Sequence, residues 1–386
     1  MPITPRGSTS APAPVEEIVE GAEADLEALV AISSPSGDRE AAERALAVCE
    51  RRLPNEALIE RVPCSSPRHA PDFIARIAGT GAAKVLLLGH VDTVVAHAKH
   101  TPLTRQGDTW RGSGSVDMKG GVALALGMAR SLSQRPELFA ELGVLLVVDE
   151  EWRLQPFAHV PRFAGYDACL CFEAGERSAD GEGVVVQRKA AGTLRVLAHG
   201  RSAHAGSNPD AGQNALLALA DAALAAAALH DPVGPEQLSV VPSMMSAGEA
   251  MNVVPGAGEL TVDVRARSET SFERVVEPIA RSSNTAKLDV ELLRSWPGMD
   301  SREATERLLE NASARLGHKI LGVSRGGASD ASHFAATIPL TIDGLGPRGG
   351  HAHSPEEFVH GPSLSERAEV AMAILEELLG SGGAVS

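Results

Sequence analysis

The spacing of apolar positions changes several times along the chain, and each change predicts a different kind of element. Between residues 15 and 53 apolar residues recur at helical spacing around the turn residues 33–37, which predicts two helices. Further on, short and nearly continuous apolar runs predict buried strands around a helix. These elements are expected at 73–77 (strand), 85–88 (strand), 122–132 (helix) and 144–148 (strand). Such an alternation is typical of a mostly parallel sheet covered by helices.

A separate pattern lies between residues 190 and 297. Its elements follow the order strand, helix, strand, strand, helix, strand, which is typical of a ferredoxin-like fold. They are expected at 193–198, 215–229, 238–244, 259–265, 271–282 and 288–293. Beyond them we expect a helix at 305–316, a strand at 340–342 and a last helix ending at Leu379. Ser363 and Glu366 are expected to form a capping box at the start of that helix.

The sequence therefore predicts an α/β fold with a second, smaller α+β domain inserted into the first. Residues 15–189 and 298–386 would form the large domain, and residues 190–297 the inserted one. Residues 1–14 are rich in Pro, Ser and Thr without periodicity, which predicts a disordered leader.

Composition excludes several classes of function. The 386-residue chain is 44% hydrophobic, which is enough to bury the cores of two domains. Its formal net charge of -15 argues against nucleic acid as a partner, because phosphate binding needs clustered Lys and Arg. No apolar run approaches the ~20 residues that span a membrane, so we expect a cytoplasmic protein without membrane partners. The four cysteines lack the spacing of a metal knuckle.

His90 and Asp92 directly follow the strand predicted at 85–88, at the edge where open α/β sheets bind ligands. On an extended chain both side chains lie on the same side, so Asp92 would orient the His90 imidazole by accepting the proton of one ring nitrogen. The other nitrogen would then be free to bind a metal ion. Taken alone, such a pair is more often an ordinary surface histidine with a polar neighbour.

Asp117 stands in the glycine-rich segment 112–121, ahead of the predicted helix. Glycines allow a backbone to approach a site closely, and Asp117 would offer its two carboxylate oxygens to two cations. Glycines before a helix also bind phosphate, but the P-loop spacing with Lys followed by Ser or Thr is missing.

Three carboxylates, Asp149, Glu150 and Glu151, follow the apolar strand predicted at 144–148. They would repel each other unless a cation or a proton lies between them, although a solvated charge run is the alternative. One of them can bind a metal ion while its neighbour acts on a water as general base.

Glu173, after the apolar run 168–172, and His353, in the segment 349–357, are two further candidate ligands. Two histidines and three carboxylates without cysteine describe a site for zinc or a similar divalent ion. A shared aspartate implies two ions, which at ~3.5–4 Å separation polarise a carbonyl and lower the pKa of a bridging water. The chemistry predicted is hydrolysis of an unactivated amide, and no Gly-x-Ser-x-Gly segment offers a competing nucleophile.

The motifs together resemble those of the zinc aminoacylase and carboxypeptidase family, the di-zinc peptidases that include the bacterial glutamate carboxypeptidases. They are His90-Val-Asp92, Asp117-Met-Lys-Gly-Gly121, Asp149-Glu-Glu151, Phe172-Glu173, Gly200-Arg-Ser-Ala-His204-Ala-Gly206 and His353-Ser-Pro-Glu, in order over nearly the whole chain. The resemblance implies that Asp117 bridges two divalent ions, zinc above all, with cobalt or manganese as alternatives. The remaining ligands would be His90 and Glu173 at one ion, and Glu151 and His353 at the other. Glu150 would be the general base, with Asp92 orienting its histidine.

The inserted domain resembles the family's lid and dimerisation domain. His204 would reach the site of the partner subunit and stabilise the oxyanion there, so catalysis would need a homodimer. Asn252 and Arg265 match the residues that hold the free carboxylate of the scissile residue, which suits a guanidinium because it forms two parallel hydrogen bonds. An arginine merely exposed on the sheet is the alternative.

The resemblance implies hydrolysis of the amide bond before a C-terminal amino acid, in an N-acyl amino acid or a short peptide. A deacylase of the acetyl or succinyl type is the alternative, and a non-catalytic dimeric binding protein is a remote one. The chain departs from many relatives at Trp152-Arg153-Leu154, and at Trp296, where glutamate-releasing relatives often have Arg before Pro. Arg294 lies two positions earlier. Trp296 widens the expected leaving residue from glutamate to apolar or aromatic ones.

Overall fold

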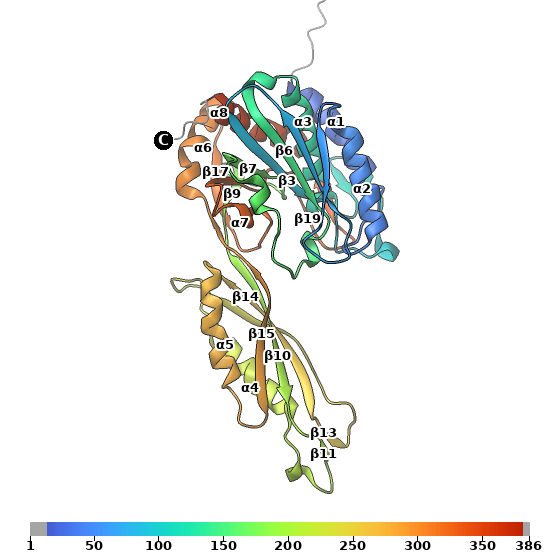
Figure 1. Ribbon diagram of the computed structural model, residues 1–386, viewed down its shortest axis with the longest axis vertical. Coiled ribbons are helices and arrows are strands. Elements are labelled where there is room, and N and C mark those ends of the chain that lie inside the picture. Colours follow the sequence, from blue (N-terminus) through green and yellow to red (C-terminus); the bar gives the residue numbers. More distant parts are fainter. Residues whose placement is uncertain (1–13, 381–386) are drawn as a thin grey trace, which may run out of the picture.

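The computed structural model describes residues 14–380, which form a large lobe and an elongated small lobe (Figure 1). Residues 1–13 of the predicted leader lie outside the described residues, and Pro14 begins the first helix. The helices are α1 (Pro14–Val30), α2 (Arg39–Arg52), α3 (Gly120–Ser133), α4 (Ala215–Ala228), α5 (Glu273–Ala280), α6 (Arg302–Leu316), α7 (Ala331–Phe334) and α8 (Ser363–Gly380). None of the helices within residues 14–380 is long and apolar enough to cross a membrane.

The central sheet of the large lobe has the strand order β1-β2-β6-β3-β7-β18. These strands are β1 (Leu58–Val62), β2 (Asp72–Ala78), β3 (Ala83–His90), β6 (Phe139–Val147), β7 (Ala168–Cys171) and β18 (Leu340–Ile342). The strands β6, β3, β7 and β18 run parallel to one another, whereas β2 is antiparallel to β6 and β1 is antiparallel to β2. Residues 85–88 of β3 are completely buried, because helices cover the sheet and join it in one apolar cluster.

Parallel strands place their carboxyl ends at one edge, and that edge carries the side chains of interest. β3 ends at His90, and the acidic residues 149–151 and Glu173 follow β6 and β7. An open α/β sheet forms its ligand crevice at such an edge. Three sequence-distant segments therefore meet because of the sheet topology.

Two smaller sheets in the large lobe do not follow from the hydrophobic pattern, because their pairings join segments that are far apart in the chain. One has the order β16-β9-β17 with β8 paired to β9, and the other has the order β19-β20-β5-β4. Their strands are β4 (Thr104–Gln106), β5 (Thr109–Arg111), β8 (Glu176–Ser178), β9 (Gly181–Arg188), β16 (Met299–Asp300), β17 (Ile320–Arg325), β19 (Gly349–Gly350) and β20 (Phe358–His360). The second sheet anchors the segment that carries His353.

The small lobe contains a four-stranded antiparallel sheet with the order β12-β14-β10-β15. Its strands are β10 (Ala190–His199), β12 (Ser239–Ala247), β14 (Ala257–Ala266) and β15 (Lys287–Trp296). This order is the ferredoxin-like one, and α4 and α5 share a separate apolar cluster with one face of the sheet. The fold class predicted from sequence is confirmed.

The two-residue strands β11 (Ala203–His204) and β13 (Val253–Val254) pair at the end of the small lobe farthest from the large lobe (Figure 1). The predicted capping box of α8 is wrong. Ser363 Oγ donates to the carbonyl of His360 at 2.6 Å, and the Glu366 carboxylate forms an ion pair with Arg348 instead of turning back to the helix start. The Arg348 guanidinium binds the Glu366 carboxylate more strongly than a backbone N–H at the helix start would.

Candidate metal centre and active site

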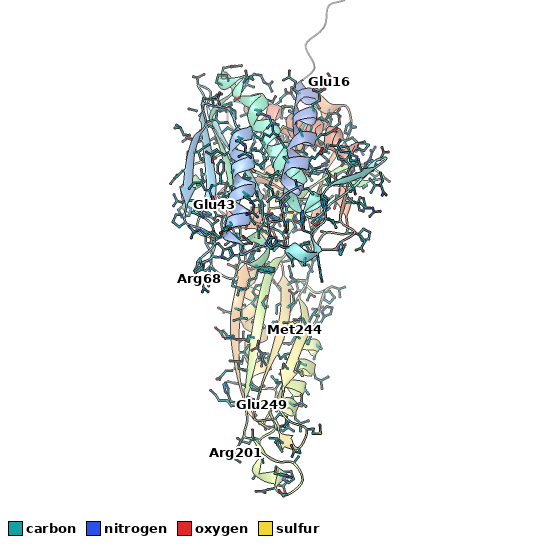
Figure 2. All side chains as sticks on the ribbon, turned by 90° about the vertical axis from the view of Figure 1, so that its right-hand side faces the viewer. Glu16, Glu43, Arg68, Arg201, Met244 and Glu249 are labelled. Carbon is teal, nitrogen blue, oxygen red and sulfur yellow. The ribbon has the colours of Figure 1, made fainter. Side chains whose placement is uncertain are left out.

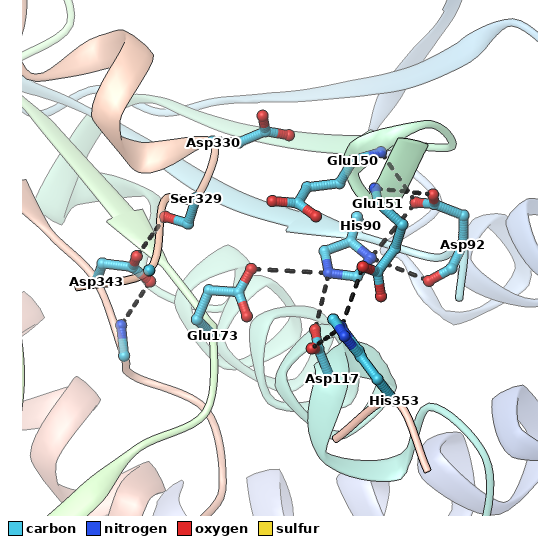
Figure 3. Close-up of polar contacts among 12 residues, drawn as sticks. His90, Asp92, Asp117, Glu150, Glu151, Glu173, Ser329, Asp330, Asp343 and His353 are labelled. Carbon is cyan, nitrogen blue, oxygen red and sulfur yellow. Dashed lines mark hydrogen bonds and ion pairs between the residues drawn. The ribbon is translucent and has the colours of Figure 1, made fainter. Parts of the chain in front are cut away.

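His90 is buried at the end of β3, and its two ring nitrogens have different surroundings. Nδ1 lies 3.0 Å from the backbone oxygen of Asp92 and 3.4 Å from its Oδ1. With two acceptors beside it, Nδ1 carries the ring proton of the neutral imidazole. Nε2 faces Asp117 Oδ1 at 3.1 Å and Glu173 Oε1 at 3.7 Å (Figure 3). When the ring is doubly protonated, Nε2 donates a hydrogen bond to Asp117, and in the neutral ring its lone pair is free to bind a cation. This is the arrangement of a metal-binding histidine held by a second residue.

Asp117 lies in the loop that leads into α3, and a close backbone approach brings it to the end of β7. A Cβ added at Gly121 would lie 1.7 Å from the carbonyl oxygen of Phe172, so only glycine allows this packing. Each Asp117 oxygen faces a different histidine: Oδ1 faces His90, and Oδ2 lies 3.0 Å from His353 Nε2. Asp117 therefore stands between two groups of donors.

Asp92 holds the turn that follows β6 in place, in addition to the ring of His90. Its Oδ1 and Oδ2 accept hydrogen bonds from the backbone N–H groups of Glu150 and Glu151, both at 3.2 Å. The turn directs the two glutamates differently. Glu151 Oε2 lies 3.1 Å from His353 Nε2, whereas Glu150 is buried beside the donors without joining either group (Figure 3).

These contacts form two groups of donor atoms, that is, of side-chain atoms that can bind a metal ion. The two groups share Asp117. The first contains His90, Asp117 and Glu173, and the second contains Asp117, Glu151 and His353. These are the five residues expected as metal ligands, and the structure brings all of them together. The groups differ in accessibility, because His90 is 1% exposed and His353 is 53% exposed.

Burial dominates the electrostatics of the carboxylates. Burial raises the pKa of Glu150 to about 7, and it raises the pKa of Glu151 and, much further, that of Glu173. At Asp117 burial acts in the same direction, but hydrogen bonds from His353 and His90 outweigh it and hold the pKa of the carboxyl below its usual value. So many acidic groups in one low-dielectric space need cationic compensation.

The donors fit divalent metal ions by their chemistry and by their unsatisfied atoms. Imidazole nitrogen and carboxylate oxygen without thiolate are ligands that zinc, cobalt and manganese accept. Glu151 Oε1 is a buried oxygen with no hydrogen-bond partner, which a cation next to it would satisfy. His90 and Glu173 would hold one ion, Glu151 and His353 the other, and Asp117 both.

A third group of potential ligands, Cys64, Asp72 and Asp149, has protein partners instead. Asp72 lies 2.7 Å from His159 Nε2 and accepts the backbone N–H of Val148 at 3.0 Å. Burial raises the pKa of the Cys64 thiol far above its usual value, which disfavours the thiolate that a metal needs. We assign no ion to this group.

The remaining site residues from the sequence lie outside this cluster. His204 and Asn252 belong to the far tip of the small lobe, where the Asn252 carbonyl accepts the backbone N–H of Ala205 at 2.9 Å. Figure 2 labels Arg201 at that tip. Arg265 lies at the opposite end of the small lobe, and its guanidinium grips Asp263 with contacts of 2.9 Å and 3.0 Å. Within one chain, neither His204 nor Asn252 reaches the donors.

Sequence reasoning missed two residues that hold the site together. Glu357 accepts backbone hydrogen bonds from Gly114, Val116 and Asp117, at 2.7, 2.9 and 3.0 Å. Arg153 is completely buried and forms ion pairs with Asp149, at 2.7 Å, and with Asp330. A glutamate directly after the His353 motif was the only available signal for the first, and nothing local distinguishes the second.

Comparisons with known proteins agree with this geometry. A model of peptidase family M20/M25/M40 matches residues 86–377. Carboxypeptidase G2 of Pseudomonas sp. (strain RS-16) is 27% identical over 371 residues, covering 92% of this chain and 88% of that protein. Succinyl-diaminopimelate desuccinylase of Methylorubrum populi is 26% identical over 367 residues, covering 87% of this chain and 94% of that protein.

Solved structures show the same fold. Aminopeptidase PepT from Bacillus cereus has a TM-score of 0.76 at 19% identity, covering 93% of this chain and 98% of that one. The YXEP protein of Bacillus subtilis is a dinuclear metal binding peptidase from the M20 family. Its structure has a TM-score of 0.67 at 14% identity, covering 95% of this chain and 99% of that one. The chain therefore belongs to peptidase family M20/M25/M40, and it is a metal-dependent hydrolase of amide bonds.

Proposed function

We propose that the protein hydrolyses the amide bond in front of a C-terminal amino acid, in the manner of a glutamate carboxypeptidase. One observation carries the proposal: Glu150 is buried next to two donor groups that share Asp117, yet it belongs to neither. A buried carboxylate that is left free beside the metal ligands is suited to move protons. The similarity to Carboxypeptidase G2 over most of both chains supports this kind of substrate.

The five ligands would hold two divalent ions, which we propose to be zinc, with cobalt or manganese as functional replacements. When bound, such ions supply Lewis-acid polarisation of the scissile carbonyl and a lowered pKa for water. Asp92 keeps His90 in the tautomer that leaves Nε2 free, and Glu357 keeps the Asp117 loop in place. These contacts preorganise the donors before the substrate arrives.

Glu150 acts as general base and then returns the proton to the leaving amine. Burial raises the pKa of the Glu150 carboxyl, which favours acceptance of a proton during the reaction. We expect Glu150→Gln to lower kcat by about 10²- to 10⁴-fold. Metal content, measured by elemental analysis, stays unchanged, because Glu150 is not a ligand. A variant with the wild-type rate would remove Glu150 from this role.

The small lobe, residues 190–297, is proposed as the lid and dimerisation domain. Exposed apolar side chains on α4, Leu217 and Leu224, and on β12, Met244 and Met245, provide apolar surface for a second copy. His204 Nδ1 accepts the backbone N–H groups of Gly206 and Ser207, both at 3.1 Å. The proton of its neutral ring therefore sits on Nε2, ready to donate to an oxyanion in the partner's site.

A complementation experiment tests this shared site. Glu150→Gln and His204→Ala each inactivate a homodimer, but a mixed dimer contains one site with an intact Glu150 and an intact partner His204. We expect activity to return when the two variants are unfolded, mixed and refolded together. If His204 served its own subunit, or if the protein worked as a monomer, no activity would return.

Asn252 and Arg265 are proposed to hold the free carboxylate of the leaving residue. The partner subunit would supply Asn252, as it would supply His204. The similarity to a succinyl-diaminopimelate desuccinylase supports one alternative, a deacylase acting on an N-acyl amine. Rates on N-acetyl, N-succinyl and dipeptide substrates separate the two, because cleavage of dipeptides supports the carboxypeptidase, whereas cleavage of the N-acyl compounds alone supports the deacylase. A cytoplasmic location and the absence of nucleic acid and membrane partners remain predictions from the sequence.

A further inference from the structure

Arg294 lies near the active site and has no counter-ion among residues 14–380. It lies near the end of β15 that joins the large lobe, is half-buried, and forms no ion pair with any acidic residue among 14–380. Its Nε is buried and has no hydrogen-bond partner. Burying a charged group without a partner costs free energy, so such a group requires an explanation.

The side chain of Trp296 holds the Arg294 guanidinium in place. The guanidinium carbon lies 4.3 Å from the centroid of the Trp296 ring, and that of Arg153 lies 4.6 Å from the same ring. The His333 ring is 4.9 Å away, and Trp296 is 1% exposed. Two arginines thus share one aromatic ring, but only Arg153 has carboxylate partners.

Trp296 itself is therefore not available to a substrate. Its surroundings are Arg153, Arg294 and His333, and it is almost completely buried. The preference for an apolar or aromatic leaving residue, expected from Trp296 in the sequence, has no support in this position. Trp296 positions a cation instead.

The register of the small sheet places Arg294 and Arg265 on one face. Thr193 lies opposite both Asp263 and Arg294, and Ala191 lies opposite both Arg265 and Trp296. The other face packs against α4 and α5 through its own apolar cluster, so this face is the one without helices. Arg265 is already paired with Asp263, whereas Arg294 has only the charges of more distant groups, among them Glu150.

We propose that Arg294 is a specificity-determining residue that binds a second carboxylate of the substrate, beyond the C-terminal carboxylate assigned to Arg265 and Asn252. The inference rests on the proposed function and narrows its substrate to a dicarboxylate. A guanidinium binds a carboxylate with two parallel hydrogen bonds.

The second carboxylate has two possible sources. It belongs either to the side chain of the leaving amino acid or to the acyl group. The first source predicts that glutamate is released faster than glutamine from the same acyl group. The second predicts that an N-succinyl amino acid is cleaved faster than the N-butyryl compound, which has nearly the same shape without the charge.

The test compares Arg294→Gln with the wild-type enzyme on both substrate pairs, with zinc present. We expect kcat/KM for the preferred dicarboxylate to fall about 10- to 100-fold, because one charged hydrogen-bond pair is lost, with little change for its neutral analogue. Arg195→Gln is the matched control. Arg195 is another arginine of the small sheet, but it is paired with Glu291 at 2.6 Å. It is expected to affect all substrates equally and weakly.

Two results would overturn the inference: equal losses on charged and neutral substrates, or a wild-type enzyme that does not distinguish the members of either pair. Failure of the proposed function is a different result, namely that no substrate in the panel is cleaved. In that case, calorimetry of the same compounds with the zinc-loaded Glu150→Gln variant decides whether the anion site exists. Weaker binding of a dicarboxylate, but not of its neutral analogue, after Arg294→Gln supports the anion site, and equal binding refutes it.

Discussion

Glu357 accepts a hydrogen bond of 3.0 Å from the backbone N–H of Asp117, and so a glutamate near the C-terminal end fixes the aspartate shared by both donor groups. The same carboxylate accepts the N–H groups of Gly114 and Val116. Three donors are satisfied by two oxygens, which only a carboxylate achieves. The loop therefore depends on the charge state of this side chain.

We expect Glu357→Gln to weaken metal binding by about 10- to 100-fold, as is typical for residues that support metal ligands. The amide has one acceptor oxygen, and its NH₂ group would face a backbone N–H that needs an acceptor. Competition with a metal indicator measures the affinity. Glu356→Gln serves as control, because Glu356 is the exposed neighbour. Unchanged affinity in Glu357→Gln would show that the loop holds its shape without this carboxylate.

The two metal ions should leave the protein at different rates. His353 is 53% exposed, whereas His90 is 1% exposed behind Asp92. A chelator should therefore remove the ion of the Glu151 and His353 group first. Elemental analysis at successive times should show two phases, and His353→Ala should abolish the fast one. Loss of both ions in a single phase would contradict the difference in accessibility.

Arg153 should be among the most important side chains for stability. Replacing it with Met leaves the buried carboxylates of Asp149 and Asp330 without their cation, and breaking a buried pair in this way costs about 3–5 kcal/mol. Urea unfolding measures the loss. Arg302→Met is the control, because Arg302 and Asp300 form an exposed pair, for which about 0–1 kcal/mol is typical. Similar losses in both variants would refute this ranking.

His333 should make the protein less stable in mild acid. Burial, helped by the charges of Arg153 and Arg294, lowers the pKa of His333 to about 3. Below pH ~6.5 the unfolded chain binds a proton at this histidine and the folded protein does not, so the free energy of unfolding falls as pH falls toward ~3.

His333→Phe retains an aromatic ring beside Phe157, which stacks on His333 at 4.8 Å, but it cannot bind a proton. We expect the variant to lose less stability between pH 7.5 and pH 5 than the wild type, by about 2 kcal/mol at most. Urea unfolding at the two pH values gives the difference. His318→Phe, at an exposed position, should behave like the wild type. If the two His variants show the same pH dependence, His333 is not responsible.

The sequence by itself determined the donor residues and much of the fold. His90, Glu151 and Glu173 each follow an apolar run, and a parallel sheet brings the ends of such runs to one edge. The ferredoxin-like order of the small lobe was likewise readable from local periodicity. These features are encoded by neighbouring residues, and so a pattern along the chain reveals them.

The tertiary structure alone decided which charged groups are already paired. Arg153 and Arg294 lie against the same Trp296 ring, yet Arg153 is paired with the distant Asp330, whereas Arg294 has no counter-ion among residues 14–380. Glu357 reaches the Asp117 loop from more than two hundred positions away in the chain. A charge finds its partner through space, and the free energy of a buried charge depends on that partner, so spacing along the chain cannot reveal it.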